Sequence, residues 1–526
     1  MRITTKVIQN NALSNININK ILQDKLNNQM STEKKINRPS DDPVIAIRAL
    51  RLRTNVSQVT QYYEKNVPDA QSWMKITEDA LTTVSSVVTD MIEQCQKGAN
   101  EKLTSTDRQT ILDALTQLKE EVFATGNADY AGRCVFTGYR TDDTLKFTAD
   151  TTKVYSITEQ LDNTAIDQIT YVDSSNINSI NDTNFNNTSN SAIEEKNVTS
   201  NEIYRIRVSY SDLDGVVPSL TTYDGTDPDN PFAPVTKDDG SGNQIPITTQ
   251  VASKNDTLNP YLNVGVDDVV LVKETGELLI GKNVYKQLMQ KTDNPSTPVD
   301  ESEIRLTYQK SNWEKDDLKP EHYFACKDTT DAAKVIEYNN DYLNGNEEKQ
   351  VIEYDVGLNQ SIRVNTTADE VFQHSIGRDV DDMIAAMQDT IDMEKSVSKI
   401  DNLIKSGNYS GDDLKYLNNQ LDAANKSLTF MKEKTQKMFE GGIAKMQGHL
   451  DTVNYATTNC GTRSKKLELI ENRLMSQKTN FETLQSDNEN ADLTEVAIKL
   501  SGAELTYQAA LMATGKIMQT SLMNYI

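Results

Sequence analysis

The chain has 526 residues, and its 54 basic and 78 acidic side chains give a net charge of −24 at pH 7. That charge argues against nucleic acid and against anionic membranes as partners, because binding to either needs clustered Lys and Arg. Hydrophobic residues make up 37% of the chain and aromatic residues only 6%, which favours long exposed helices over one thick globular core. The acidic surface should also keep separate copies apart until specific contacts form.

The first predicted helix is polar, with a sparse apolar stripe. Its apolar side chains are spaced by 4, 11, 4 and 4 residues and so stay near one helix face. They are Ile3, Val7, Ile18, Leu22 and Leu26. Most of the other residues are Asn, Gln, Ser or Lys, so this helix alone buries too little surface to offset the entropy of ordering it. We therefore expect it to need a partner.

A turn bracketed by two prolines ends the first helix. Its residues are Asn37, Arg38, Pro39, Ser40, Asp41, Asp42 and Pro43. Ser and Asp are good N-caps and Pro43 suits a first helical turn, so this motif predicts the start of a second helix. That helix should run from Val44 to about Gly98, with a heptad seam in its later part. Pro68 should kink or split it.

After Gly126 the pattern changes from helix to strand. A small β-hairpin is predicted between Tyr130 and Tyr139, and residues 146–371 are rich in Asn, Asp, Ser, Thr and Gly. Short hydrophobic runs at 203–208, 269–272 and 304–308 predict strands in this region. Residues 173–197 are so polar that disorder is expected there.

Helices return from Ala368 to the end of the chain. A break is predicted at Gly407–Gly411, and the pair Gly441-Gly442 predicts a bend. In the last helix, only Glu504 and Lys516 are charged after Ser501.

The small and apolar residues of this last helix follow a 3–4 rhythm, with a second stripe beside the first. They are Leu493, Val496, Leu500, Ala503, Tyr507, Ala510, Thr514 and Ile517, with Leu511, Met518 and Leu522 beside them. Because terminal helices normally fray, a terminal helix with so many apolar and so few charged residues should be buried against another surface. That cover can come from the N-terminal helix, from neighbouring copies, or from both.

Patterns that carry catalysis or metal binding are missing from the sequence. The three histidines are far apart, and there is no HExxH, GxSxG, phosphate-loop or dinucleotide glycine motif. The four cysteines form no CxxC pair and should be small buried or half-buried thiols. We predict a protein that is not an enzyme and has no cofactor or metal. No run reaches the apolar length of a membrane span, and the N-terminus lacks a signal-peptide core, so an exported chain would need another export route.

Several of these segments resemble one family, the flagellar hook-associated protein 3 family within the flagellin-like proteins. The N-terminal resemblance lies in Lys34 to Pro43 with Arg48 to Arg53, in Asn66 to Trp73, and in Phe136 to Thr141. The C-terminal resemblance lies in Asp492-Leu493, Tyr507 to Leu511, and Thr514 to Leu522.

The resemblance implies a structural role in the bacterial flagellum. The family forms a layer between hook and filament and adapts hook-associated protein 1 to flagellin. Its members leave the cell unfolded through the flagellar type III export channel, so the expected location is extracellular. The expected partners are other copies of the chain, hook-associated protein 1, flagellin and a flagellar export chaperone. The terminal helices would pair as the inner tube. Their assembly interface would be the N-terminal stripe with Leu493, Val496, Leu500, Tyr507, Leu511, Ile517, Met518 and Leu522.

The predicted fold class is α+β, with long terminal helices forming a coiled-coil or helical-bundle rod and a β-rich inserted outer domain. Residues 1–40 with 495–526 would form the terminal helical pair, and 41–145 with 372–494 the helical rod with its small hairpin. Residues 146–371 would be the insertion. Two alternatives remain open. One is a flagellin or hook-associated protein 1 itself, and the other is a secreted protein whose insertion binds glycan or cleaves peptide.

Overall fold

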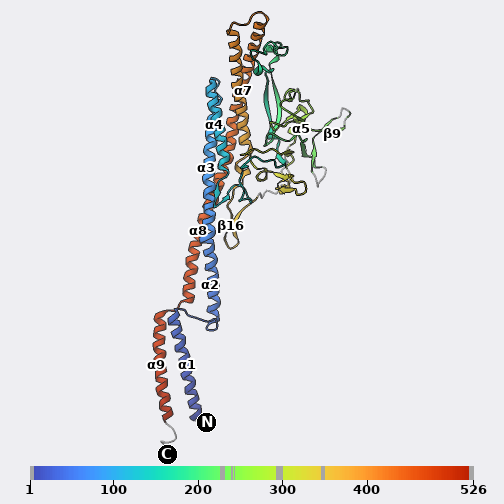
Figure 1. Cartoon of the computed structure of the whole chain (residues 1–526). Helices are drawn as coiled ribbons and strands as arrows, with labels where there is room; N and C mark the ends of the chain where they lie inside the picture. Colours follow the sequence, from blue (N-terminus) through green and yellow to red (C-terminus); the bar gives the residue numbers. More distant parts are fainter. Residues whose placement is uncertain are drawn as a thin grey trace, which may run out of the picture. The chain divides into compact units, whose positions relative to one another are not determined.

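The computed structural model describes residues 5–225, 231–238, 241, 243–256, 258–291, 300–344 and 350–519. Long helices occupy both ends of the chain and strands occupy the middle, so the predicted α+β class is confirmed (Figure 1). The chain forms two compact units. The terminal unit comprises Met1–Gln71, Tyr354–Ile362 and Lys465–Ile526, and the central unit comprises Ser72–Glu353 and Arg363–Ser464. The three-part division drawn from the sequence stays a prediction.

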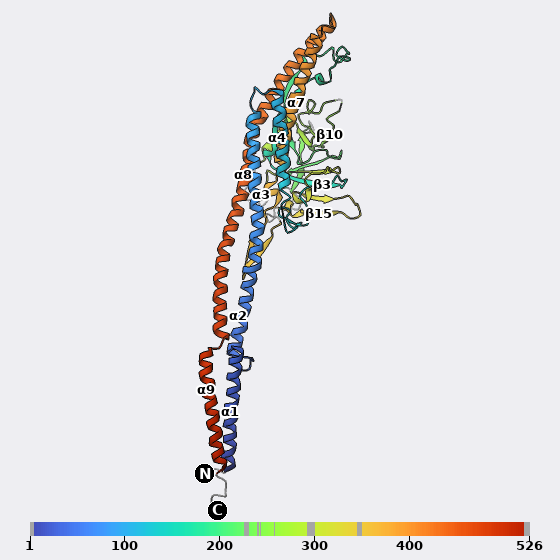
Figure 2. The ribbon, with the colours of Figure 1, turned by 60° about the vertical axis from the view of Figure 1, so that its left-hand side comes forward.

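In the terminal unit, the first and last helices lie side by side. Helix α1 (Thr5–Thr32) packs along α9 (Leu493–Gln519), and Figures 1 and 2 show the pair from two directions. Two backbone hydrogen bonds join the chain after α1 to the chain before α9. Lys35 N donates to Glu489 O at 2.8 Å, and Ala491 N donates to Glu33 O at 2.9 Å. The two helices are therefore antiparallel, and the predicted pairing of the two extremities is found.

The proline-bracketed turn caps α2 (Pro43–Gln61) as its residues predict. The Asp42 carboxylate accepts hydrogen bonds from the backbone N–H groups of Val44 and Ile45, and Pro43 begins the helix. The Asp41 carboxylate accepts from the N–H groups of Asn37 and Arg38. These backbone bonds lower the pKa of Asp41 from its usual value.

Pro68 neither breaks the helix nor splits it. Helix α2 continues into a π-helical turn, η1 (Tyr62–Asn66), and then into α3 (Val67–Gly98). Proline cannot donate to the carbonyl four residues earlier, and its ring crowds that carbonyl. A π turn placed just before Pro68 supplies the extra width that the ring needs. The predicted split at Pro68 is therefore wrong, because the chain stays helical through a widened turn, and the predicted kink stays a prediction.

Helix α8 (Asp412–Glu489) runs through the glycine pair without interruption. A Cβ atom on Gly442 would lie 2.6 Å from Met383 Sδ and 3.7 Å from Cys95 Sγ, whereas one on Gly441 would meet nothing within 4 Å. Gly442 thus allows close packing of α8 against α3 and α7 (His374–Lys405). The bend predicted at the glycine pair stays a prediction, and close packing gives Gly442 a structural reason of its own. The break at residues 406–411, between α7 and α8, is present.

The remaining helices lie in the central unit. Helix α4 (Ser105–Thr125) begins at a capping box formed by Thr104 and Asp107 and packs on α7. Helices α5 (Lys282–Met289) and α6 (Ala368–Val371) are short.

Two sheets form the β-rich part of the central unit. Their strand orders are β15-β14-β3-β13-β6-β7 and β10-β11-β12-β5-β4, antiparallel throughout except for the parallel pair β10-β11. The strands are β3 (Tyr155–Leu161), β4 (Ile166–Asp173), β5 (Thr199–Arg207), β6 (Ser219–Tyr223), β7 (Phe232–Pro234), β10 (Gln250–Ala252), β11 (Val269–Val272), β12 (Glu277–Ile280), β13 (Ile304–Lys310), β14 (Ala325–Asp328) and β15 (Ile336–Tyr338). Two short hairpins accompany them, namely β1 (Asp129–Tyr130) with β2 (Arg133–Cys134) and β8 (Thr236–Asp238) with β9 (Gln244–Pro246), whereas most of a third, β16 (Glu353–Gly357) with β17 (Gln360–Arg363), belongs to the terminal unit.

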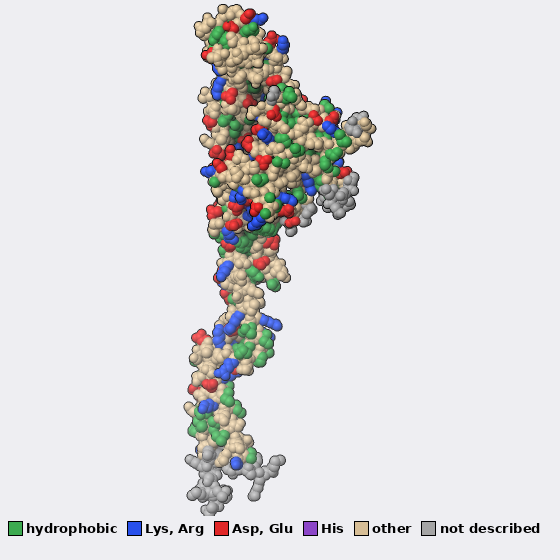
Figure 3. All heavy atoms as spheres, turned by 45° about the vertical axis from the view of Figure 1, so that its right-hand side comes forward, with side chains coloured by type: hydrophobic (Ala, Val, Ile, Leu, Met, Phe, Trp, Pro, Cys, Tyr) green, Lys and Arg blue, Asp and Glu red, His purple; other side chains and the backbone are tan. Residues whose placement is uncertain are grey.

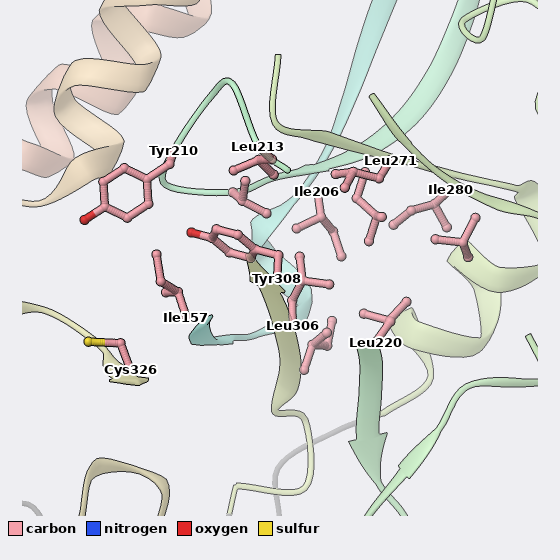
Figure 4. Packing of buried hydrophobic residues seen from close by; sticks show 14 of the residues in the cluster. Ile157, Ile206, Tyr210, Leu213, Leu220, Leu271, Ile280, Leu306, Tyr308 and Cys326 are labelled. Carbon is pink, nitrogen blue, oxygen red and sulfur yellow. The ribbon is translucent and has the colours of Figure 1, made fainter. Parts of the chain in front are cut away.

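One hydrophobic core joins the two sheets. Ile157 and Leu306 from one sheet and Ile206 and Leu271 from the other are buried in the same cluster, with Tyr308 among them (Figure 4). The strands predicted at 203–208, 269–272 and 304–308 are therefore found, and their apolar residues form this core.

The polar segment 173–197 is folded, so the expectation of disorder there is wrong. Its few apolar residues, Ile177, Ile180, Phe185 and Ile193, are buried in one cluster with residues of α7 and α8. The buried Gln420 side chain donates to the backbone carbonyls of Phe185 and Asn190 at 2.7 and 2.8 Å. Four apolar side chains and a buried amide therefore order a segment whose average composition is that of a loop.

Candidate assembly interface

The seam between α1 and α9 follows a heptad rhythm on both helices. On α9 the buried or half-buried residues are spaced by 4 and 3, and on α1 they are spaced by 3 and 4. The α9 side consists of Val496, Leu500, Ala503, Tyr507, Ala510 and Thr514, and the α1 side of Gln9, Ala12, Ile16, Asn19, Gln23 and Leu26. The 3- and 4-residue spacing seen in the sequence of the last helix therefore identifies the face of α9 that packs against α1.

This seam has a small apolar core. Leu26, Val496 and Ala503 are 5 to 6% exposed and form one cluster, which Ala491 and Leu500 border. Half of the α1 side is Gln or Asn. Because burial of apolar area is the main force that holds two helices together in water, the seam alone holds this pair weakly.

A second apolar stripe on α9 faces away from the seam. Ile498, Leu505 and Met512 are seven residues apart and are 69, 68 and 68% exposed. At about 100° per residue, these three positions lie ~180° around the helix from the centre of the seam. Figure 3 shows hydrophobic side chains on the open surface of the terminal helices.

Helix α1 also carries a second stripe. Val7, Ile18, Ile21 and Leu22 are between 45 and 69% exposed. By the same rotation they lie roughly 140° around α1 from its seam. Each terminal helix therefore keeps exposed apolar side chains outside the seam, and on α1 these also include Ile8 and Leu13.

The residues predicted for the assembly interface fall into three groups. Leu26, Val496, Leu500 and Tyr507 lie in the seam, while Val7, Ile18 and Leu22 lie on the open stripe of α1. Leu493 and Leu511 are exposed residues of α9 beside its seam. Ile517 and Met518 belong to α9, but their side chains, like Ile3 and Leu522 as a whole, lie outside the described residues.

This division has a geometric cause. Each step of four residues turns a helix by about 400°, so a ladder of such steps drifts by ~40° per step. The stripe read from Ile3 to Leu26 therefore fans across the helix until Leu26 reaches the seam. Sequence reasoning missed Ile21, Ile498, Leu505 and Met512, although the seven-residue spacing of the last three was the signal that could have found them.

Residues 37–43 form the turn between α1 and α2 in the terminal unit. An ion pair between Arg53 and Glu489 lies in the same unit. Arg53 Nε and Nη2 each lie 2.7 Å from one carboxylate oxygen of Glu489, whose side chain is 5% exposed. Lys34 Nζ is 3.6 Å from the same carboxylate. The hydrogen bonds from Arg53 lower the pKa of Glu489 from its ordinary value. The predicted motif residues, which are mostly exposed, thus form a structured corner that joins α1, α2 and the end of α8.

Charge is divided unequally between the two units. The terminal unit has 17 basic and 15 acidic residues, so the central unit, with 37 basic and 63 acidic residues, has a net charge of −26. Two copies of the terminal unit can therefore approach without the like-charge repulsion that the overall composition implies.

Ionisable groups of the central unit serve its packing. Asp379 of α7 lies 3.1 Å from Lys445 Nζ and 3.0 Å from His449 Nε2 of α8, and it also pairs with Arg207 of β5. These contacts keep the pKa of Asp379 well below its usual range despite burial. The group joins the sheet to two helices. It therefore has a structural explanation that needs no substrate.

Buried histidines and thiols in this unit are held in their neutral forms. Burial lowers the pKa of His322 to about 4 and that of His374 to about 3. It raises the pKa of the Cys95 thiol to about 12. All four cysteines are free thiols, three buried and Cys134 half-buried, as expected. His, Cys, Asp and Glu side chains of the described chain do not gather in threes that could hold a metal ion. Within the described ranges, no helix has the length and apolar run that a membrane crossing needs.

The N-terminal part of the chain matches a known family. Residues 3–141 match the family described as bacterial flagellin N-terminal helical region. Flagellar hook-associated protein 3 of Salmonella typhimurium (strain LT2) is 29% identical over 143 residues, and that of Escherichia coli (strain K12) is 27% identical over 143 residues. Each match covers 27% of this chain and 45% of the relative, so the chain spans less than half the length of these curated relatives.

Solved structures of similar name are more distant. A flagellar hook associated protein-3 from Legionella pneumophila is 9% identical with a TM-score of 0.29, and the match covers 83% of this chain and 97% of that one. FlgL from Xanthomonas campestris is 11% identical with a TM-score of 0.26, covering 81% of this chain and 98% of that one. These TM-scores are too low to carry weight. The family match and the named relatives show that the N-terminal part of the chain is similar to the N-terminal helical region of bacterial flagellins and to flagellar hook-associated protein 3.

Proposed function

We propose that this protein is a structural component of the bacterial flagellum that forms the junction layer between hook and filament. The observation that supports this most directly is the open apolar stripe on each of the paired terminal helices. The names of the sequence relatives, flagellar hook-associated protein 3 in two bacteria, support a location in the flagellum.

The physical argument is that the terminal helices are incomplete in a single copy. Ile498, Leu505 and Met512 are about two-thirds exposed, and burying one such side chain fully contributes roughly 1.5–3 kcal/mol. In the isolated helix pair about two-thirds of this burial is not realised, but a lattice of copies gains it at every contact. The folding of the pair is then completed by assembly. The near-neutral terminal unit suits such close packing, and the acidic central unit suits exposure to water.

The partners follow from this role. Copies of the chain would contact one another through α1 and α9, hook-associated protein 1 would lie on the hook side, and flagellin on the filament side. Before export, the same apolar stripes would need a flagellar export chaperone to cover them. The protein would leave the cell through the flagellar export channel and function outside it.

Labelled antibodies on intact cells test this proposal. A single band between hook and filament is the expected result, and cells lacking the protein should carry hooks without filaments. Label along the whole filament would identify a flagellin instead. That alternative has some support, because a flagellin of Clostridium tyrobutyricum is 30% identical over 122 residues, which cover 23% of this chain and 32% of that relative. Label on the cell surface away from flagella would favour a secreted protein with a glycan-binding or peptidase insertion.

A further inference from the structure

We propose that the N-terminal end of α7 is a binding site for a small organic oxoanion, a molecule that carries a carboxylate or phosphate group on a polar body. The site is a hollow of about 420 Å³ in the central unit, and its walls come from α7, α8, β3, β4 and β5. Residues of α7 that line it include His374, Ser375, Arg378 and Asp379. This site goes beyond the proposed role in assembly and does not depend on it.

The first turn of α7 has no side-chain cap. Gln373 is the N-cap residue, and its side chain accepts no hydrogen bond from the N–H groups of that turn. In the same unit, α4 and α6 both begin at capping boxes. The N–H groups at the start of a helix carry a partial positive charge, which favours an anion there. Because every helix has such an end, further evidence is needed to identify a site.

His374 supplies evidence that is independent of the helix end. The residue is only 9% exposed, and its Nε2 atom is buried with no hydrogen-bond partner among the described residues. Burial lowers the pKa of this imidazole to about 3, so the ring is neutral at pH 7 and has one N–H group to donate. A buried polar atom without a partner is unfavourable. An oxygen atom of a ligand would satisfy it.

Arg378 adds a positive charge that the carboxylates around it do not neutralise. Its Nη2 atom donates to a backbone carbonyl, but its Nε atom is buried and lacks a partner within the described part of the chain. The nearby carboxylates of α7 pair with other cations, Asp381 with Lys119 at 2.6 Å and Asp382 with Arg205. Burial lowers the pKa of Arg378, because its charge has lost water without gaining an equal partner.

The acidic side chains that line the hollow oppose an anion only weakly. Asp379 and Asp167 lie 3.1 and 3.3 Å from Lys445 Nζ, so each has a cation beside it. Glu159 is buried and accepts a hydrogen bond from the N–H group of Ser209 at 2.9 Å. Burial raises the pKa of Glu159, which favours its uncharged form. The charge of Arg378 is therefore the one that remains available.

The size of the hollow favours a ligand larger than an inorganic ion. Small-molecule sites in proteins enclose roughly 300–1,000 Å³, and this hollow falls within that range. Thr164, Ser209, Ser375 and Thr452 also line it, and hydroxyl groups both donate and accept hydrogen bonds. The lining thus suits an organic acid or a phosphate ester that carries hydroxyl groups of its own.

Titration of the full chain with four small molecules tests the site. Malate carries carboxylates and a hydroxyl, glycerol 3-phosphate carries a phosphate and hydroxyls, inorganic phosphate is a bare oxoanion, and glycerol has no anion. Calorimetry at fixed ionic strength measures the affinity, and the imidazole ¹⁵N signals of the three histidines show which ring the ligand contacts. We expect malate or glycerol 3-phosphate to bind and to shift the His374 signal, and glycerol not to bind. Binding of malate alone assigns a carboxylate ligand, and binding of glycerol 3-phosphate alone assigns a phosphate ester.

Two variants separate binding from folding. His374→Phe keeps the ring that packs edge-on against Tyr210 and Tyr323, at centroid distances of 4.8 and 4.4 Å, and removes the nitrogen atoms. Without ligand this variant should unfold at the same temperature or higher, because it loses a buried polar atom that has no partner. Its affinity for the acid should nevertheless fall at least about tenfold. Arg378→Gln should weaken binding at least as much. Lys432→Gln removes a positive charge of α8 outside the hollow and should leave the affinity unchanged.

Three results would overturn the proposal. The first is that the folded, unsubstituted chain binds none of the three anions. The second is that inorganic phosphate binds as tightly as both organic acids, which would mean a site for a bare ion. The third is that affinity is unchanged in His374→Phe or falls equally in Lys432→Gln, which would mean that the anion is held elsewhere. His374→Phe and the ¹⁵N signal decide the matter if Arg378→Gln does not fold. The location of the protein on cells is measured separately, so the proposed function can stand if this site fails.

Discussion

Replacing Leu505 with aspartate should block assembly and leave the single copy folded. Leu505 is 68% exposed in the single copy, so a carboxylate there stays in water. At a contact between copies, the change would forfeit about two-thirds of a leucine's burial, ~1–2 kcal/mol, and would bury an unpaired charge at a cost of several kcal/mol more. A loss of at least ~3 kcal/mol per contact corresponds to more than 100-fold weaker association.

Sedimentation measures this effect as the concentration needed for polymer to form. Circular dichroism of the unassembled variant should match that of the unsubstituted chain. The matched control is Thr506→Asp, which adds the same charge one residue away, at an exposed position on neither the seam nor the stripe. If Leu505→Asp polymerises at the normal concentration, or if Thr506→Asp blocks polymer equally well, the assignment of this stripe to an interface is wrong.

Three further outcomes follow from the packing. In the unassembled chain, backbone amides of α1 and α9 should exchange with deuterium much faster than those of α8, and protection equal to that of α8 in a monodisperse sample would refute the weak seam. Because the folded pKa of Glu489 is lowered, its pairing with Arg53 stabilises the protein above the ordinary Glu pKa of about 4.3 and this stability is lost on acidification. The unfolding temperature of Glu489→Gln should therefore fall less from pH 6 to pH 3 than that of the unsubstituted chain. An equal fall in both proteins would remove the role assigned to this pair. In urea unfolding, Gly442→Ala should lower the free energy of unfolding by about 1–3 kcal/mol, because the new Cβ meets Met383. Gly441→Ala should raise it by up to ~1 kcal/mol, because its Cβ meets nothing and alanine favours helix. Changes of the same sign in both variants would contradict the close packing at Gly442.

Local chemistry made much of the helical part predictable. The spacing of small residues in the last helix identified the face of α9 that meets α1. Alternating steps of 3 and 4 residues keep side chains on one helix face over several turns, and such a face packs against another helix. Asp42 and Pro43 located the start of α2, because the cap geometry accepts few other residues. The residues of α1 that face α9 were less predictable. Its seam uses Gln and Asn, which a search for apolar residues passes over.

Tertiary context decided where sequence reasoning failed. The sequence does not reveal that Gly442 packs beside the sulfur atoms of Met383 and Cys95, and no local pattern predicts the π turn that accommodates Pro68. The segment 173–197 has the composition of a disordered loop, yet Ile177 and Phe185 bury against helices distant in sequence. The order of the strands depends on pairings between distant residues, such as β14 with β3, where Asp328 pairs with Tyr155 across 173 residues. Nothing within a single strand specifies those partners.

Because the two units differ in charge, added salt should favour assembly. Copies brought together by neutral terminal units also bring together central units that carry the whole net negative charge. Raising the ionic strength from ~0.01 M to ~0.15 M shortens the screening length from about 30 Å to about 8 Å, which weakens this repulsion, while burial of Leu505 and its neighbours is little affected. The concentration needed for polymer should therefore fall as salt is added, measured by sedimentation at fixed pH. A rise would mean that ion pairs between copies hold the lattice, and the apolar stripes would then be secondary to them.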